Sequence, residues 1–212
     1  MTPFLDLRAQ YRAIGPDLEQ AVISTMRDGT FVLGERVERF EADFARYCGT
    51  SFAVAVNSGT SALHLALLAA GIGPGDEVIT VSATFVATTA AIVNAGATPG
   101  YVDIDPATWT MRPDLIAASV TSRTRAIMPV HLHGRLADMD AINAVARQFG
   151  LLVIEDAAQA HGAERNGTRA GAFGDIGCFS FYPGKNLGAC GEGGAITTNR
   201  ADLAAAVRSL RD

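Results

Sequence analysis

Short apolar segments alternate with segments of helical periodicity through the middle of the chain. The apolar segments are typical of strands buried on both faces, and they lie at 52–56, 77–81, 98–104, 125–132 and 151–157. The segments between them predict helices at 61–71, 85–96, 113–119 and 138–150. Near-continuous apolar strands that alternate with helices predict an α/β fold, with a mainly parallel sheet and helices on both of its faces.

Two further helices are predicted before this series. The first covers 6–29 and is expected to break at Gly15 and Pro16, because proline removes a helical hydrogen bond. The second covers 35–49, and its apolar residues recur at helical spacing: Val37, Phe40, Phe44 and Tyr47. No internal repeat, low-complexity segment or linker is found within the first 200 residues, so the sequence predicts one domain.

The composition fits a folded protein and excludes several classes of partner. With 49% hydrophobic residues among 212, the chain can bury a core. The net charge of -5 arises from 22 acidic and 17 basic residues without a basic cluster, so no nucleic acid is expected as a partner. The longest apolar runs are far shorter than the roughly 18 residues that span a bilayer, and residues 1–10 lack a signal-peptide pattern. We therefore expect no membrane partner and a cytoplasmic location.

The cysteines and two of the histidines bear on whether the protein binds a metal. Cys48, Cys178 and Cys190 are an odd number without C-x-x-C spacing, which predicts neither a disulfide framework nor a zinc site and fits a reducing compartment. His131 and His133 of the segment "VHLHG" would lie on one face of a strand, a spacing compatible with a metal. No third ligand follows at a suitable spacing. A structural or substrate-lining role is therefore favoured, and no metal is expected.

The segment "NSGTSALHLAL" (57–67) takes an apolar strand through a small, polar turn directly into a helix. The free amides of Gly59, Thr60 and Ser61 would then point outward at a helix N-terminus, which suits a phosphate group. An alternative stays open, in which Ser58 or Thr60 serves only as the cap of the helix.

The segment "LLVIEDAAQAHG" (151–162) ends a buried strand with two acids, at the place where α/β proteins bind ligands. Alternation along the strand puts Glu155 and Asp156 on opposite faces. Two interpretations are compatible with this pattern. One of the acids is catalytic, or one is a helix cap and the other is solvated.

Lys185 stands in the aromatic and glycine-rich segment "FSFYPGKNLGACGEGG" (179–194). A lysine in such a loop is usually a phosphate-binding cation or a covalent catalyst. The phosphate-binding loop G-x-x-x-x-G-K-[ST] is excluded, because Phe179 replaces its first glycine and Asn186 follows the lysine. The segment "GIGPGDEV" (71–78) likewise lacks the glycine spacing of dinucleotide-binding proteins.

Five segments occur in the same order as in one known family: "NSGTSALHLAL", "ATF" (83–85), "VHLHG", "EDAAQAHGA" and "SFYPGKNLGACGEGG". Together they resemble the pyridoxal-phosphate-dependent nucleotide-sugar aminotransferases of the DegT/DnrJ/EryC1/StrS family, over nearly all of the 212 residues. The resemblance implies the large domain of aminotransferase fold type I. Family members continue into a smaller C-terminal domain. Residues 1–212 are therefore expected to comprise an N-terminal arm and the large, cofactor-binding domain, with the chain ending before the small domain.

The resemblance also implies a role for each site residue. Lys185 would bind the aldehyde of pyridoxal 5'-phosphate covalently, and partial burial among aromatic residues would lower its pKa. Asp156 would pair with the pyridine nitrogen of the cofactor, while Glu155 would face elsewhere. Gln159 would lie near the phenolic oxygen, and Phe85 would cover one face of the ring. For a phenylalanine, ordinary core packing is the more common role.

The phosphate group would be held by backbone and hydroxyl groups of four residues: Gly59, Thr60, Ser61 and Ser180. The implied activity is transamination in two half-reactions, in which glutamate or another amino acid gives its amino group to a nucleotide-linked keto-deoxysugar, with the keto group expected at position 3. The complete family fold implies a homodimer. A second class stays open, in which the chain is a truncated, non-catalytic or partner-dependent remnant of such an aminotransferase.

Overall fold

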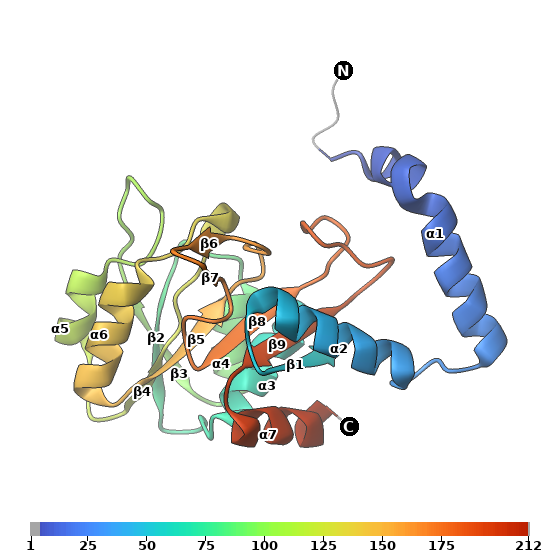
Figure 1. Ribbon diagram of the computed structural model, residues 1–212. Coiled ribbons are helices and arrows are strands. Elements are labelled where there is room, and N and C mark those ends of the chain that lie inside the picture. Colours follow the sequence, from blue (N-terminus) through green and yellow to red (C-terminus); the bar gives the residue numbers. More distant parts are fainter. Residues whose placement is uncertain (1–4, 212) are drawn as a thin grey trace. The chain divides into compact units, whose positions relative to one another are not determined.

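The computed structural model describes residues 5–211 and divides the chain into two units, Met1–Phe40 and Glu41–Asp212. Asp212 and the first four residues lie outside the described range. The predictions about a signal peptide and about the domain limits depend in part on these residues. Helix α1 (Leu7–Asp28) belongs to the first unit, and helix α2 (Glu35–Cys48) runs from the first unit into the second (Figure 1). The expectation of an N-terminal arm and a large domain stays a prediction.

Helix α1 (Leu7–Asp28) begins after the N-cap Asp6, whose carboxylate accepts a hydrogen bond from a first-turn amide at 2.9 Å. It ends at Gly29, whose φ of 68° is the left-handed conformation that glycine adopts readily. The predicted break at Gly15 and Pro16 is wrong, because the helix continues through both residues. Proline removes one donor, but the carbonyl that it leaves unpaired lies on a largely exposed helix, where water can satisfy it.

A seven-stranded sheet forms the centre of the second unit. Its strands in spatial order are β1 (Phe52–Val56), β9 (Gly194–Thr198), β8 (Ile176–Ser180), β5 (Leu152–Asp156), β4 (Thr124–Ile127), β2 (Glu77–Val81) and β3 (Thr98–Val102). Neighbouring strands are parallel except where β9 pairs with β1 and with β8. The mainly parallel sheet that the sequence predicts is confirmed.

The sequence pattern did not predict the last strands of the chain. They are β8, β9 and the short hairpin of β6 (Glu164–Arg165) and β7 (Thr168–Arg169). The segments of β8 and β9, "IGCFS" and "GAITT", contain glycine and small polar residues, which are poor strand signals. Both strands are nevertheless buried along their whole length, because they pair inside the sheet.

Side chains alternate between two apolar cores on the two faces of the sheet. Along β2 and β5, Val78 and Ile154 pack into one core, whereas Ile79 and Val153 pack into the other. The helices that cover the first core are α3 (Gly59–Ala69), α4 (Ala87–Asn94) and α7 (Ala201–Arg211), and those that cover the second are α5 (Ile116–Ser119) and α6 (Met139–Phe149) (Figure 1). The predicted α/β fold with helices on both faces is confirmed. Within residues 5–211, no helix has the length and apolarity that crossing a membrane requires.

The strand predicted at 125–132 ends earlier, at Ile127. Pro129 has no amide hydrogen for a further ladder bond, and an isolated bridge between Val130 and Asp156 follows before the 3-10 turn. His131 is fully buried, whereas His133 has a φ of 54° inside a 3-10 turn (Leu132–Gly134). The prediction that the two histidines share one strand face is therefore wrong.

Candidate active site

A cavity of about 540 Å³ lies where β5 and β8 end and α3 begins. It is lined by seven of the eight residues that the sequence predicts for a cofactor site: Gly59, Thr60, Phe85, Asp156, Gln159, Ser180 and Lys185. A volume of this size is typical of small-molecule sites, and the carboxyl ends of parallel strands are where α/β proteins place them. The fold thus brings together side chains from four motifs that are far apart in the chain.

Asp156 is the last residue of β5 and is only 5% exposed. Its Oδ2 accepts a hydrogen bond from Thr88 Oγ1 at 2.6 Å, and its Oδ1 accepts one from the Ala158 amide at 3.1 Å. Burial raises the pKa of the carboxyl group, while these hydrogen bonds and the nearby charge of Lys185 oppose the rise. The cavity therefore has one buried acid in its wall.

Glu155 has entirely different partners, as the predicted alternation requires. It is fully buried, and its oxygens accept hydrogen bonds from three amides of the 171–174 turn at 2.7 to 2.9 Å. A fourth hydrogen bond comes from His131 Nε2 at 2.9 Å. Because His131 Nδ1 accepts from the Ala137 amide at 3.1 Å, the ring hydrogen must be on Nε2. Glu155 therefore anchors a turn.

Replacing Glu155 with glutamine should destabilise the fold. The new NH₂ group would face amide or imidazole donors in a buried site, leaving at least one donor without an acceptor. We expect a loss of about 2 to 4 kcal/mol in the free energy of unfolding. Urea denaturation measures it, with Glu164→Gln on the exposed hairpin as the matched control. A loss below about 0.5 kcal/mol, the usual size of a surface change, would contradict the anchoring role.

The N-terminus of α3 forms another part of the cavity wall. Gly59 packs so closely on Ser180 that a Cβ added to it would lie 2.5 Å from the Ser180 Cβ. The amides of Gly59 and Thr60 donate to no acceptor within residues 5–211, so they are free to bind an anion. The Ser61 amide, expected to be free, instead donates to Ser58 Oγ at 3.1 Å. Both interpretations of this segment thus hold in part, because Ser58 caps the helix while two amides stay free.

Ser61 is the one predicted cofactor residue outside the cavity lining; Ser58 lines it instead. The Ser61 hydroxyl accepts a hydrogen bond from Ser58 Oγ at 3.1 Å, and its predicted contact with a phosphate group stays a prediction.

Gln159 and Phe85 present complementary groups to the cavity. The Oε1 atom of Gln159 accepts a hydrogen bond from the His133 amide at 2.9 Å, which leaves the side-chain NH₂ group available as a donor. Phe85 is 65% exposed and lines the cavity, so core packing does not describe it. An aromatic side chain in a cavity wall suits stacking on a flat ring.

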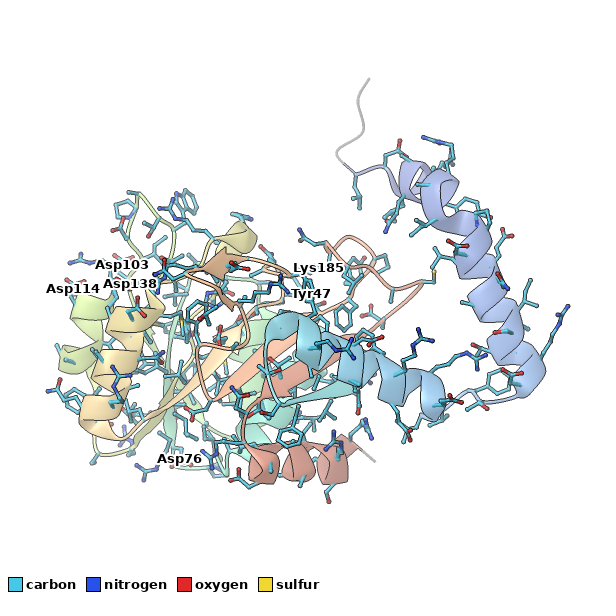
Figure 2. The ribbon with its side chains drawn as sticks, viewed as in Figure 1. Tyr47, Asp76, Asp103, Asp114, Asp138 and Lys185 are labelled. Carbon is cyan, nitrogen blue, oxygen red and sulfur yellow. The ribbon has the colours of Figure 1, made fainter. Side chains whose placement is uncertain are left out.

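Lys185 is the only lysine among the 212 residues. It belongs to the loop that joins β8 to β9, where its amide donates to the Tyr182 carbonyl at 2.8 Å (Figure 2). Partial burial lowers the pKa of its amine, and the Asp156 carboxylate opposes this shift. A lowered pKa increases the neutral, nucleophilic fraction of the amine near neutral pH.

Several cavity residues were not singled out from the sequence. They are Leu63, Thr84, Ala87, Val130, Leu132, Ala158, Tyr182 and Glu192. Most of them adjoin a predicted residue in the chain, so reading one or two positions beyond each motif finds them. His131 also lines the cavity, but it is fully buried and both of its ring nitrogens are hydrogen-bonded within the protein, so a substrate-lining role stays a prediction. Thr88 is different, because no sequence spacing signals its hydrogen bond to Asp156.

A second cavity, of about 680 Å³, is lined by three arginines and three aspartates among other residues. Asp114 and Asp138 of this group lie away from Lys185 (Figure 2). Arg112 pairs with Asp114 at 2.5 Å, and Arg165 with Asp138 at 3.6 Å. The formal charges of its arginines and aspartates therefore sum to zero.

Comparisons with known proteins place the chain in a family. A profile of the DegT/DnrJ/EryC1/StrS aminotransferase family matches residues 12–212. The chain belongs to this family. The resemblance inferred from five segments is thereby confirmed, and with it the type I aminotransferase fold.

Several known proteins are closely similar to the chain. A "pleiotropic regulatory protein" of Geobacillus stearothermophilus is 49% identical, over 99% of this chain and 56% of its own length. The dTDP-3-amino-3,4,6-trideoxy-alpha-D-glucose transaminase of Streptomyces venezuelae is also 49% identical, over 99% of this chain and 55% of its own length. The crystal structure of NtdA from Bacillus subtilis with bound cofactor PMP is 38% identical, with a TM-score of 0.91 over 97% of this chain and 47% of NtdA. The chain thus spans about half the length of these relatives.

Proposed function

We propose that the protein transfers an amino group from an amino acid such as glutamate to a nucleotide-linked keto-deoxysugar, with pyridoxal 5'-phosphate as cofactor. One observation carries the proposal: a single cavity is lined by the only lysine of the chain, a buried carboxylate and two free amides at a helix N-terminus. The similarity to the Streptomyces transaminase supports a nucleotide-linked deoxysugar as substrate. Its 3-amino sugar supports a keto group at position 3. The cofactor is supported by the PMP-bound relative.

The cavity fits the phosphate group of this cofactor. The amides of Gly59 and Thr60 and the hydroxyl of Ser180 provide donors, and the start of α3 adds a positive helix terminus. The absence of a side chain on Gly59 is what allows α3 to approach Ser180, since a Cβ would collide there. We propose that these groups, together with the Ser61 hydroxyl, hold the phosphate.

The remaining lining residues fit the ring. We propose that Asp156 faces the pyridine nitrogen, that the Gln159 NH₂ group donates to the phenolic oxygen, and that Phe85 covers one ring face. The Asp156 carboxylate would keep a proton on the ring nitrogen, because a negative charge in a buried site favours a protonated partner. When bound, the cofactor supplies an electron sink for the negative charge that develops at the substrate carbon.

Lys185 performs two tasks in this proposal. Its neutral amine would hold the cofactor through the aldehyde, and a lowered pKa favours that neutral form. When it is not bound to the cofactor, the same amine would accept the proton that leaves Cα of the amino donor. An amine that can both accept and return a proton near neutral pH suits a reaction made of two reversible half-reactions.

We further propose that the complete protein is a homodimer. Two apolar side chains of the second unit stay exposed at the start of α4 and in its last turn: Val86 at 67% and Val93 at 56%. Exposed apolar side chains on one helix are compatible with a surface that a partner covers.

The proposed activity can be tested in two steps with purified, cofactor-loaded protein. L-Glutamate alone should release one equivalent of 2-oxoglutarate, and a dTDP- or UDP-linked 3-keto-deoxysugar added next should become the amino sugar. The corresponding 4-keto sugar is the matched control and should react at least about tenfold more slowly. Release of no keto acid from any amino donor by loaded protein would contradict the proposal and favour the non-catalytic alternative.

A further inference from the structure

Two threonine hydroxyls form a chain that ends on the buried carboxylate of the cavity. Thr84 Oγ1 and Thr88 Oγ1 are 2.7 Å apart, and Thr88 Oγ1 is 2.6 Å from Asp156 Oδ2. Thr84 lines the cavity, whereas Thr88 is fully buried. The hydroxyl of Thr88 is therefore shielded from water and has these two oxygen atoms as its partners.

The direction of these hydrogen bonds depends on the charge of Asp156. A carboxylate has no hydrogen to give, so the Thr88 hydroxyl must donate to it. Thr88 can then only accept from Thr84, which makes the Thr84 hydroxyl the first donor of the chain. A donor to a buried carboxylate stabilises the charged form, and a hydrogen bond to a charged group is stronger than one between neutral groups.

Other groups near Asp156 do not replace this donor. His131 uses Nε2 on Glu155 and Nδ1 on the Ala137 amide, so neither ring nitrogen is available. Burial holds the pKa of the Cys178 thiol well above its ordinary value, which keeps that neighbour neutral. The charge of Lys185 favours the carboxylate only while the amine is protonated.

The carboxylate of Glu155, the other acid nearby, accepts its hydrogen bonds from the 171–174 turn and from His131. Within residues 5–211, the Asp156 carboxylate thus accepts hydrogen bonds from two donors, the Thr88 hydroxyl and the Ala158 amide.

We propose that Thr88 is a positioning residue whose hydroxyl keeps Asp156 charged and fixes the orientation of its carboxylate. The role rests on the proposed function, in which Asp156 holds the proton of the cofactor ring. Thr88 touches neither cofactor nor substrate in this proposal; it acts through Asp156. The hydroxyl of Thr84 completes the chain by fixing the direction of the Thr88 hydrogen.

Three substitutions in the full chain test this role. Thr88→Val keeps the shape of the side chain and removes the hydroxyl, whereas Thr88→Ser keeps the hydroxyl and removes a methyl group. Thr80→Val is the matched control, because Thr80 is equally buried and its hydroxyl donates to a main-chain carbonyl, that of Met128, at 2.9 Å. Thermal unfolding of each variant checks that it is folded.

The first readout is the pKa of Asp156 without any cofactor, measured by carbon NMR on protein labelled at the aspartate carboxyl groups. Asp156→Asn assigns the signal. Thr88→Val should raise this pKa by about one unit, and Thr88→Ser should leave it near the original value. Since a raised pKa means more protonated acid as pH falls, Thr88→Val should also bind pyridoxal phosphate more weakly, with the loss growing towards low pH.

The outcomes separate the proposal from a structural role and from the proposed function. An unchanged Asp156 pKa in Thr88→Val overturns it, as does an equal shift in Thr88→Ser or in Thr80→Val. Because the NMR readout uses no cofactor, a shift confined to Thr88→Val supports the positioning role even if pyridoxal phosphate fails to bind. In that case the proposed function fails and the hydrogen-bond chain stands.

Discussion

Replacing Lys185 with arginine is expected to abolish both half-reactions, with a loss of at least about 10⁴-fold in rate. Arginine retains the positive charge but stays protonated in proteins, so it can neither attack an aldehyde nor take a proton from Cα of the donor. Charge-based binding of the phosphate would survive, because the proposed phosphate donors lie on α3 and at the end of β8. The rate of 2-oxoglutarate release from glutamate measures the effect.

The chain offers a sharp control for this variant, because Lys185→Arg leaves it without any lysine. Arg147 is exposed on α6, so Arg147→Lys in the same background restores a lysine outside the cavity. The double variant should remain inactive. A half-reaction within about tenfold of the original rate in either variant would show that the catalytic amine is not that of Lys185.

Asp156→Asn is expected to slow the half-reaction with glutamate by about 10² to 10⁴-fold while the protein stays folded. The amide has nearly the shape of the carboxylate but no charge, so it cannot hold a proton on the ring nitrogen. The fold should tolerate it, because the Thr88 hydroxyl can turn and accept a hydrogen bond from the new NH₂ group. Single-turnover kinetics and urea denaturation together measure the two effects.

Glu155→Gln is the natural comparison, since it makes the same chemical change at the neighbouring residue of the same strand. We expect the two variants to separate: Asp156→Asn loses rate and keeps stability, whereas Glu155→Gln loses stability and keeps the rate of its folded fraction. Equal rate losses per folded molecule would contradict the assignment of Asp156 to the ring nitrogen.

The sequence predicts the parts of this fold that rest on local periodicity. Buried parallel strands and amphipathic helices have patterns that a single segment reveals, and so β2 and β5 were placed within one residue at each end. The pattern does not predict strands β8 and β9, because their small residues form strands only through pairing inside the sheet. The pattern does not predict that the helix continues through Pro16. The helix tolerates the proline because its two capped ends and exposed surface outweigh one lost hydrogen bond.

The candidate site divides in the same way. Asp156 and Lys185 stand in segments whose residue types suggest chemistry, and the fold brings both to one cavity. Strand alternation puts the two adjacent acids on opposite faces, and the family resemblance indicates that Asp156 is the one in the site. In contrast, Thr88 of α4 contacts Asp156 at the end of β5. This contact depends on how separate elements dock, which no spacing in one segment encodes.

The central claim, that Lys185 carries the cofactor, can be tested by one labelling experiment. The protein is incubated with pyridoxal phosphate, reduced with borohydride, digested and mapped by mass spectrometry. Because the sequence has a single lysine, the α-amino group is the competing site for the label. We expect about one pyridoxyl group per chain on the peptide that contains Lys185, and none on that peptide in Lys185→Arg. A label confined to the α-amino group, or no label, would contradict the claim.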